Sequence, residues 1–504
     1  MNTLTVTTSL GALRGEQQEG LCVFRGVPYA EPLQGLGRIR RAVPVARWSG
    51  EREALQFGPA APQENLPVLG TGPSGDACLS LNIWTPAIDA RLPVMVWIHG
   101  GGYTTGSSAQ ALFRAERLAR EGGVVVVSLN YRLGILGFGY WADFPALKGD
   151  SNVGLRDQIM ALEWVREHIA SFGGDPGRVT VFGESAGGMS IACLLASPVA
   201  RGLFQRAIIQ SGSGDHVVRP DQAARMAGVF AAAAGDVAAC LEGPLEGIIK
   251  AQRGCSRELV ERGEHNPPVP QFAMTLMPVY GDDILPQHPE QALAAGSSAD
   301  IPLLIGTNTE EWNLFYFAPQ VLGLSRGRTE TDDERQLHEF ERAMPGQGAA
   351  MRETYRSLLP PGSSRDDVFC AFESDRMFNI PTLRLLEART QAQASSWAYR
   401  FDWPCPLMRA LKSCHIMDVP FVFGVTGEPT GQFFTGGGEA AAQLSVQVRA
   451  AWTAFAKGQS PAASGWPEWP PYDLGQRTML HIAAESRLVH DPESGRRLAW
   501  EGKI

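Results

Sequence analysis

The chain has 504 residues, of which 44% are hydrophobic and 19% are charged. This composition is typical of a soluble globular protein with a large core. The formal net charge of -9 disfavours binding to nucleic acid or to an anionic membrane, because both are negatively charged. No apolar run approaches the roughly 18 residues that a membrane-spanning helix needs. We therefore expect neither nucleic acid nor membrane as a partner.

The N-terminal residues 1–8 alternate between polar and apolar side chains, which is typical of a strand. They lack the charged region followed by an apolar region that marks a secretion signal. The sequence therefore predicts a cytoplasmic protein, although a mature form that had lost its signal would read the same way.

Continuous apolar runs predict strands at residues 94–98, 124–129, 179–182, 207–209 and 302–305. Continuous runs, rather than alternating ones, are typical of strands covered on both faces. Residues 154–172 carry apolar side chains at helical spacing between two of these runs. This alternation predicts an α/β protein with a mainly parallel, doubly wound sheet flanked by helices, and with ligands at the carboxyl ends of the strands.

Ser185 has the surroundings of an activated nucleophile. Residues 183–187 read Gly-Glu-Ser-Ala-Gly and follow the predicted strand 179–182. Glycines two positions either side of the serine allow a tight bend that exposes its oxygen. The helix expected after the bend points its positive N-terminal end at the same place. A glycine-rich chain contains this pattern by accident at a frequency on the order of a few tenths, so it needs support from elsewhere.

Residues 99–102, with the sequence His-Gly-Gly-Gly, give that support. They follow the predicted strand 94–98. A serine hydrolase of this architecture has, in a loop at this place upstream of the serine, backbone amides that bind an oxyanion. A serine bend and an upstream glycine loop, each directly after a strand, favour a catalytic site over a structural turn.

These motifs resemble those of the type-B carboxylesterases, an α/β-hydrolase family that also includes the cholinesterases and many bacterial esterases. The resemblance covers nearly the whole chain. Further matching blocks lie at residues 24–30, 78–84, 130–134, 172–176, 210–212 and 469–473. The resemblance implies the α/β-hydrolase fold and hydrolysis of carboxylic esters through an acyl-enzyme, with no metal or other cofactor.

A nucleophilic serine needs a base, and the base needs an acid to orient it. In this fold the order along the chain is serine, acid, histidine. Of the nine histidines, His415 lies in a block, residues 413–424, that resembles the family's histidine loop. The family pattern places the acid at Glu311, with Glu310 as the alternative. Trp312 replaces the glycine that ends this pattern, which leaves the local turn open.

The resemblance implies roles for residues around the triad. The amides of Gly101, Gly102 and Ala186 are expected to form the oxyanion hole. Glu184 is expected to face the pocket. Ser211 is expected to support the triad residues without contacting the substrate. The alternative for each of these two is a hydrogen-bonded buried polar group without a functional role.

Two segments interrupt the alternation of strand and helix. Residues 319–367 are polar, punctuated by glycine and proline and helical in patches, which predicts a lid-like insertion over the active site. Residues 426–439 are rich in glycine and threonine and predict a mobile surface loop. Neither segment has the linkers of an independent domain, so we expect residues 1–504 to form a single domain.

The chain has eight cysteines and no C-x-x-C pair. In secreted relatives the cysteine that matches Cys78 closes a loop with an upstream partner, but no cysteine lies between Cys22 and Cys78. We expect buried free thiols in a reducing compartment, rather than disulfides or a zinc site.

Cholinesterases bind a quaternary ammonium group on a tryptophan that lies about ten residues before the matching cysteine. Val68 stands there in this chain, so choline esters are not expected. Side chains near the triad loops are candidates for the pocket lining: Tyr103, Trp312, Phe315, Met417 and Phe421. The sequence favours a monomeric hydrolase of short to medium acyl esters or aryl esters. An amidase or carbamate hydrolase with the same triad is the alternative, and a non-catalytic binding module is a remote one.

Overall fold

The strands form one sheet whose middle is parallel. The computed structural model describes residues 2–64, 70–262, 274–321 and 332–503. In these residues thirteen strands pair in the order β1-β2-β3-β5-β7-β6-β8-β9-β10-β11-β12-β13, with β4 paired to β2. Their bounds are β1 Asn2–Thr7, β2 Ala12–Gln18, β3 Leu21–Pro28, β4 Glu51–Glu53, β5 Ser80–Thr85, β6 Leu92–Ile98, β7 Val125–Leu129, β8 Gly174–Glu184, β9 Arg206–Gln210, β10 Leu303–Asn308, β11 Ser396–Phe401, β12 Thr478–Ile482 and β13 Arg487–His490.

Pairing is parallel from β7 through β6, β8, β9, β10 and β11 to β12. It is antiparallel along β1-β2-β3-β5-β7 and between β12 and β13. The strands predicted from apolar runs are β6 to β10, so the prediction of a mainly parallel sheet is confirmed. The strand-like alternation of residues 1–8 corresponds to β1, whereas the other antiparallel strands at the two ends of the sheet were not predicted.

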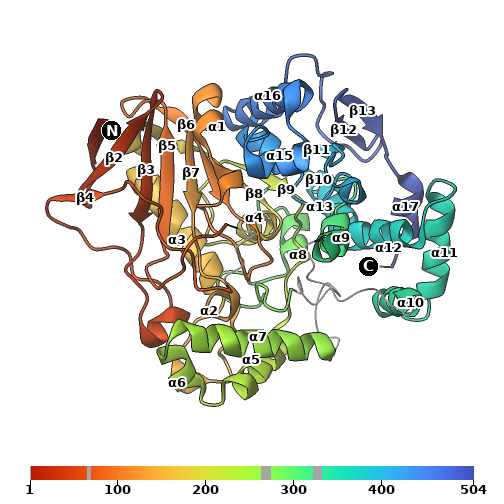
Figure 1. Cartoon of the computed structure of the whole chain (residues 1–504), viewed down its shortest axis with the longest axis horizontal. Helices are drawn as coiled ribbons and strands as arrows, with labels where there is room; N and C mark the ends of the chain where they lie inside the picture. The colour runs from red at the N-terminus through yellow and green to blue at the C-terminus, as the bar shows by residue number, and fades with distance from the viewer. Residues whose placement is uncertain (1, 65–69, 263–273, 322–331, 504) are drawn as a thin grey trace.

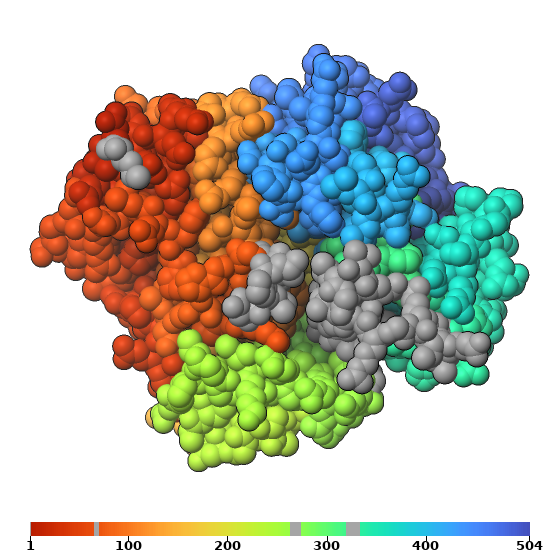
Figure 2. Space-filling model, in the orientation of Figure 1, coloured from red at the N-terminus to blue at the C-terminus, as the bar shows by residue number. Residues whose placement is uncertain are grey.

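Helices cover both faces of the sheet (Figure 1). They are α1 Glu116–Gly122, α2 Gly134–Phe138, α3 Val153–His168, α4 Ala186–Ala196, α5 Pro220–Ala234, α6 Val237–Glu242, α7 Leu245–Glu261, α8 Pro289–Ala294, α9 Asn313–Val321, α10 Asp332–Ala343, α11 Gly348–Leu358, α12 Arg365–Ser374, α13 Ile380–Gln391, α14 Val419–Phe423, α15 Pro429–Thr435, α16 Gly438–Ala456 and α17 Ser494–Ala499. The N-terminal strands and the C-terminal segments lie on opposite sides of the molecule (Figure 2).

The two faces of the sheet have separate cores, as β6 illustrates. Val96 and Ile98 belong to the core that includes residues of α3 and α4. Met95 and Trp97 belong to the core formed with α1, α14 and α16. Successive side chains of a strand point to opposite faces, so a strand inside a doubly covered sheet is apolar at every position.

The predictions for residues 319–367 and 426–439, the two segments that interrupt the alternation of strand and helix, compare differently with the structure. The described part of residues 319–367 contains α10, α11 and the start of α12. Helices α10 and α11 lie at one edge of the molecule, and α11 packs against α17 (Figure 1). Its placement over the active site stays a prediction, and residues 322–331 lie outside the described residues. The prediction of a loop at residues 426–439 is wrong, because the segment contains α15 and the start of α16. Gly436, with φ 76°, ends α15 in the left-handed conformation, so this glycine caps a helix.

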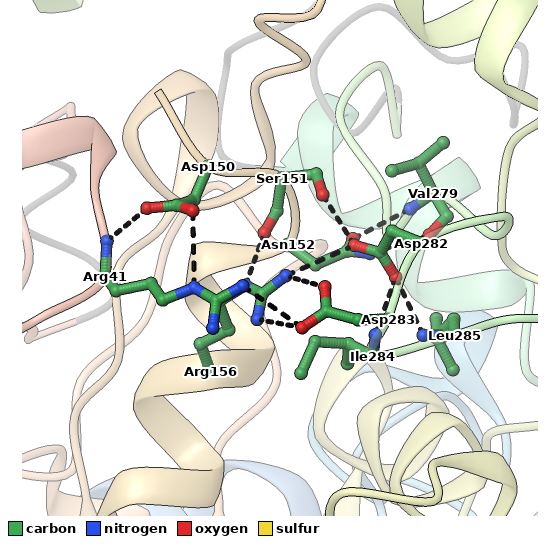
Figure 3. Close-up of polar contacts among 10 residues, drawn as sticks. All are labelled: Arg41, Asp150, Ser151, Asn152, Arg156, Val279, Asp282, Asp283, Ile284 and Leu285. Carbon is green, nitrogen blue, oxygen red and sulfur yellow. Dashed lines mark hydrogen bonds and ion pairs between the residues drawn. The ribbon is translucent and has the colours of Figure 1, made fainter. Parts of the chain in front are cut away.

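A polar network ties the start of α3 to the loop before α8 (Figure 3). Asp282 accepts hydrogen bonds from Ser151 Oγ at 2.5 Å and Asn152 Nδ2 at 2.9 Å. Asp283 pairs with Arg156 at 2.5 Å and with Arg41 at 3.1 Å. These contacts join segments more than a hundred residues apart and fix the entry into α3, the long helix between β7 and β8.

All eight cysteines are free thiols. In the described ranges, no helix is both long enough and apolar enough to cross a bilayer.

Candidate active site

Ser185 lies at the bend between β8 and α4, with φ 56° and ψ -128°. A non-glycine residue in this conformation is strained, at a cost of about 1–3 kcal/mol. The flanking glycines are required by close approach: a Cβ at Gly183 would lie 2.6 Å from the Ile98 carbonyl oxygen, and a Cβ at Gly187 would clash with the same atom. The Ser185 amide donates to the Gln210 carbonyl at 2.9 Å, which ties the bend to β9. Ser185 is half-buried while its neighbours are buried.

His415 and Glu311 meet at the carboxyl end of the sheet. His415 Nδ1 lies 2.6 Å from Glu311 Oε2, although 104 residues separate them. The other carboxylate oxygen, Oε1, accepts hydrogen bonds from Ser211 Oγ at 2.5 Å and from the Asn308 amide at 2.7 Å. Glu311 is fully buried, and these contacts hold its carboxylate in one orientation. Nδ1 of His415 therefore carries the proton that Glu311 accepts.

The second nitrogen of His415 faces the tight bend at residues 183–187 that carries Ser185, which we call the elbow. Nε2 has no hydrogen-bond partner among the described residues, and it lies 3.1 Å from Oε1 of Glu184, the residue before Ser185. No hydrogen bond joins Ser185 to His415 in the described chain. Catalytic hydrogen bonds are often long before substrate binds, and a neutral imidazole whose Nδ1 proton is bound by Glu311 is able to accept a proton at Nε2.

Glu310 contacts the backbone of Ser413. Its carboxylate accepts a hydrogen bond from the Ser413 amide at 3.1 Å, and its own amide donates to the Ser413 carbonyl at 2.9 Å. Burial raises the pKa of Glu310 to about 7. Glu310 thus joins the β10–α9 turn to the histidine loop, while Glu311 contacts the imidazole.

The glycine loop packs directly against the elbow. A Cβ at Gly100 would lie 2.9 Å from the Ser185 Cβ. Gly101 has φ 115° and Gly102 has φ 60°, which are left-handed values that favour glycine. Gln63 fixes the end of the loop by accepting from the Gly106 amide at 2.9 Å and donating to its carbonyl at 2.8 Å.

The donors expected for an oxyanion are free in this arrangement. No described residue accepts a hydrogen bond from the Gly101 or Gly102 amide. Ala186 is the first residue of α4, where helix amides lack partners within the helix. Three backbone donors thus lie around the bend that carries Ser185, and such donors stabilise a tetrahedral oxyanion.

The family model described as "Carboxylesterase family" matches residues 2–499. The chain belongs to the carboxylesterase family. It is 36% identical over 497 residues to phenmedipham hydrolase of Pseudarthrobacter oxydans, covering 96% of this chain and 95% of the relative. It is 34% identical over 501 residues to para-nitrobenzyl esterase of Bacillus subtilis, covering 98% and 97%.

Solved structures of carboxylesterases are similar to this one over their whole length. A thermophilic para-nitrobenzyl esterase superposes with a TM-score of 0.84 at 34% identity, covering 99% of this chain and 100% of that one. A Geobacillus stearothermophilus carboxylesterase gives 0.85 at 33% identity, with the same coverage. The protein therefore has the α/β-hydrolase fold and is a serine hydrolase that acts on carboxylic esters.

The charges around His415 shift its titration in this carboxylesterase. Burial alone would lower the pKa of His415, but the carboxylates of Glu184 and Glu311 outweigh burial and raise it to about 9. Burial raises the pKa of Glu184 to about 8, against the opposing effect of His415. Glu184 Oε1 and His415 Nε2 are 3.1 Å apart, so the two groups titrate as a coupled pair. The pair loses its last proton at a pH above the ordinary pKa of histidine.

His99, the other histidine of the site, is fully buried. Its Nδ1 lies 2.8 Å from the Gly100 carbonyl, and Tyr131 Oη donates to the His99 carbonyl at 2.8 Å. Burial lowers the pKa of His99 to about 4. His99 is therefore a neutral side chain that shapes the loop.

Of the five pocket candidates, Phe315 is the one in ring contact with His415, at 5.0 Å between centroids. The other four are completely buried: Tyr103, Trp312, Met417 and Phe421. Phe378, whose ring lies 4.7 Å from that of His415, was not predicted as part of the site. No local motif distinguishes Phe378 from a core phenylalanine.

Val68, the residue at the position of the cholinesterase tryptophan, lies outside the described residues. In the described ranges, no group of His, Cys, Asp and Glu could hold a metal ion.

Proposed function

We propose that Ser185, His415 and Glu311 are the catalytic triad of this esterase. The observation that carries the proposal is the 2.6 Å contact between His415 Nδ1 and Glu311 Oε2, which leaves Nε2 facing the elbow. Glu311 is preferred to Glu310, since Glu310 is bonded to the Ser413 backbone. A base oriented in this way activates a serine that is otherwise a weak nucleophile.

His415 Nε2 removes the hydroxyl proton of Ser185, whose oxygen attacks the ester carbonyl. The amides of Gly101, Gly102 and Ala186 stabilise the oxyanion, each contributing roughly 3 kcal/mol. His415 then gives the proton to the departing alcohol, and an acyl-enzyme remains on Ser185. Water, activated by His415, repeats the sequence and releases the acid. The residues present supply every step, so we propose no metal or organic cofactor.

We propose short to medium acyl esters, and esters of aryl or benzyl alcohols, as substrates. Phe315 and Phe378 give the His415 side of the site two aromatic surfaces, which favour apolar groups. The name of para-nitrobenzyl esterase, 34% identical, points in the same direction. Hydrolysis of amides or carbamates by the same triad is the second candidate.

A panel of nitrophenyl esters with graded acyl chains, together with para-nitrobenzyl esters, anilides and carbamates, tests these proposals. We expect kcat/KM to be highest for esters and lost in Ser185→Ala. Preference for anilides or carbamates would replace the ester assignment, and activity retained by Ser185→Ala would overturn the triad.

We also propose a cytoplasmic monomer with a single domain. The free state of all eight cysteines supports a reducing compartment, and one sheet running from β1 to β13 supports a single domain. Fractionation of the source cells, sedimentation velocity and the cooperativity of urea unfolding test the three parts separately.

A further inference from the structure

The C-terminal helix α17 is bonded to the interior of the protein by a buried ion pair. Arg496 donates from Nε to Asp375 Oδ2 at 2.7 Å and from its terminal nitrogen to Oδ1 at 2.6 Å. The Asp375 side chain is 2% exposed and the Arg496 side chain is 11% exposed. Two parallel hydrogen bonds fix geometry as well as charge, so this pair sets the position of the Asp375 carboxylate.

Asp375 begins a turn of unusual geometry. Residues Asp375–Asn379 form the π-helical turn η7, in which the Ile380 amide donates to the Asp375 carbonyl five residues earlier. Such turns are rare and are found frequently at functional sites. The Asp375 carboxylate also accepts from Asn379 Nδ2 at 2.8 Å and from Tyr355 Oη at 2.5 Å. The pair with Arg496 thus supports the turn from outside.

The turn packs against the proposed base. Phe378 lies 4.7 Å from the His415 ring, and Phe315 lies 5.0 Å from it. The two phenylalanine rings are 6.2 Å apart and almost parallel, at 5°. A displacement of η7 would remove one of the two aromatic surfaces against which the imidazole rests.

The same turn is bonded to the strand that leads to Glu311. Asn379 Oδ1 accepts from Thr307 Oγ1 at 2.7 Å and also from the Arg400 guanidinium. Thr307 precedes Asn308, whose amide binds Glu311 Oε1. On the far side of Glu311, the Trp312 amide donates to Oγ of Ser374, the residue before η7, at 2.9 Å.

We propose that Arg496 is a positioning residue for catalysis: through Asp375 it holds η7, and η7 fixes the orientation of His415 and of the turn that carries Glu311. The inference rests on the proposed roles of His415 and Glu311. It predicts that loss of the pair slows the chemical step while substrate binding is retained, because Arg496 lies behind the triad.

Arg496→Met and Arg497→Met form a matched test. Arg497 lies on the same helix but pairs with Asp491 at 2.8 Å, where the side chains are 19% and 33% exposed. In Arg496→Met we expect kcat for a nitrophenyl ester, and the rate of Ser185 labelling by a fluorophosphonate, to fall about tenfold or more, with KM changed less than about twofold. Arg497→Met should leave all three within about twofold of the native enzyme. Circular dichroism at the assay temperature ensures that only folded protein is compared.

The double variant Asp375→Asn/Arg496→Met provides the rescue. It removes the charge that Arg496→Met leaves buried without a partner, so its kcat should exceed that of Arg496→Met. Equal kcat in folded Arg496→Met and Arg497→Met, a loss confined to KM, or a double variant no better than Arg496→Met would each overturn the inference. His415→Ala and Glu311→Gln are assayed in the same series: if they retain turnover, the proposed triad itself fails.

Discussion

Glu184 Oε1 lies 3.1 Å from His415 Nε2, the nitrogen opposite the one that contacts Glu311. The imidazole is therefore flanked by a carboxylate on each side. Glu311 orients the ring and accepts its Nδ1 proton. Glu184 adds negative charge at the nitrogen that must lose and regain a proton in every cycle, so we expect it to control the pH range of activity.

The first prediction concerns Glu184→Gln. The carboxylates of Glu184 and Glu311 raise the pKa of His415 against burial, so the acid limb of the activity profile should lie above the ordinary range of histidine. Removing the Glu184 charge removes part of the rise, and the acid limb of the kcat/KM profile should move to lower pH by on the order of one unit.

The control is Glu290→Gln. Burial also raises the pKa of Glu290 to about 8, but the charges that act on it are Asp215 and Arg384 rather than His415. The Glu290 variant should keep the native acid limb. A limb that stays in place in Glu184→Gln would show that Glu184 does not set the charge of the imidazole.

The second prediction compares two adjacent acids. Glu311→Gln should lower kcat by roughly 10³ to 10⁴, because an amide cannot hold the correct imidazole tautomer. Glu310→Gln should lower kcat less than about tenfold, because its partner is the Ser413 amide, which an amide oxygen can also bind. Both variants are measured on one nitrophenyl ester, and the reverse ranking would transfer the role of the acid to Glu310.

The third prediction is that a fluorophosphonate labels Ser185 and no other serine, since only an activated serine attacks phosphorus rapidly. Peptide mapping of the labelled enzyme locates the site. Ser190→Ala is the control on the same helix: Ser190 accepts from Gln158 Nε2 at 3.1 Å and is not part of the proposed triad. Its labelling should equal that of the native enzyme, whereas Ser185→Ala should take up none.

The fourth prediction concerns the thiols. Titration in denaturant without reductant should find all eight, because all are free. In the native protein the thiol of Cys240 should react before the others, because it is the only one of the eight that is not buried, even though partial burial raises its pKa. Cys240→Ser should abolish the rapid phase. Fewer than eight thiols in denaturant would mean that disulfides form and would contradict the cytoplasmic assignment.

The middle of the sheet and the elbow could be predicted from sequence, since both have local signals: continuous apolar runs, and glycines around a serine. β11 could not, because its buried residues include Ser396 and Arg400. Arg400 is accommodated by Asn379 and by Glu493 at 3.4 Å, partners distant in sequence. Phe378 escaped prediction for the same reason, since its place beside His415 depends on a π-helical turn held by tertiary contacts.

The choice between Glu310 and Glu311 was open in the sequence. The order of elements along the chain placed both glutamates just after β10. Only the contacts of each side chain show which of the two is the catalytic acid. Those contacts depend on Ser211, which directly follows β9, and on Ser413 of the histidine loop.

The sequence separation of 104 between Glu311 and His415 also bears on how the enzyme matures. Closing so long a loop is slow compared with forming local contacts, and the described chain between these two residues includes β11 and the five α-helices α9 to α13. The hydrolytic site exists only once these elements have assembled on β10. Recovery of turnover during refolding should therefore lag behind the return of helical circular dichroism. The rate at which ester hydrolysis recovers would then report on the last stage of assembly.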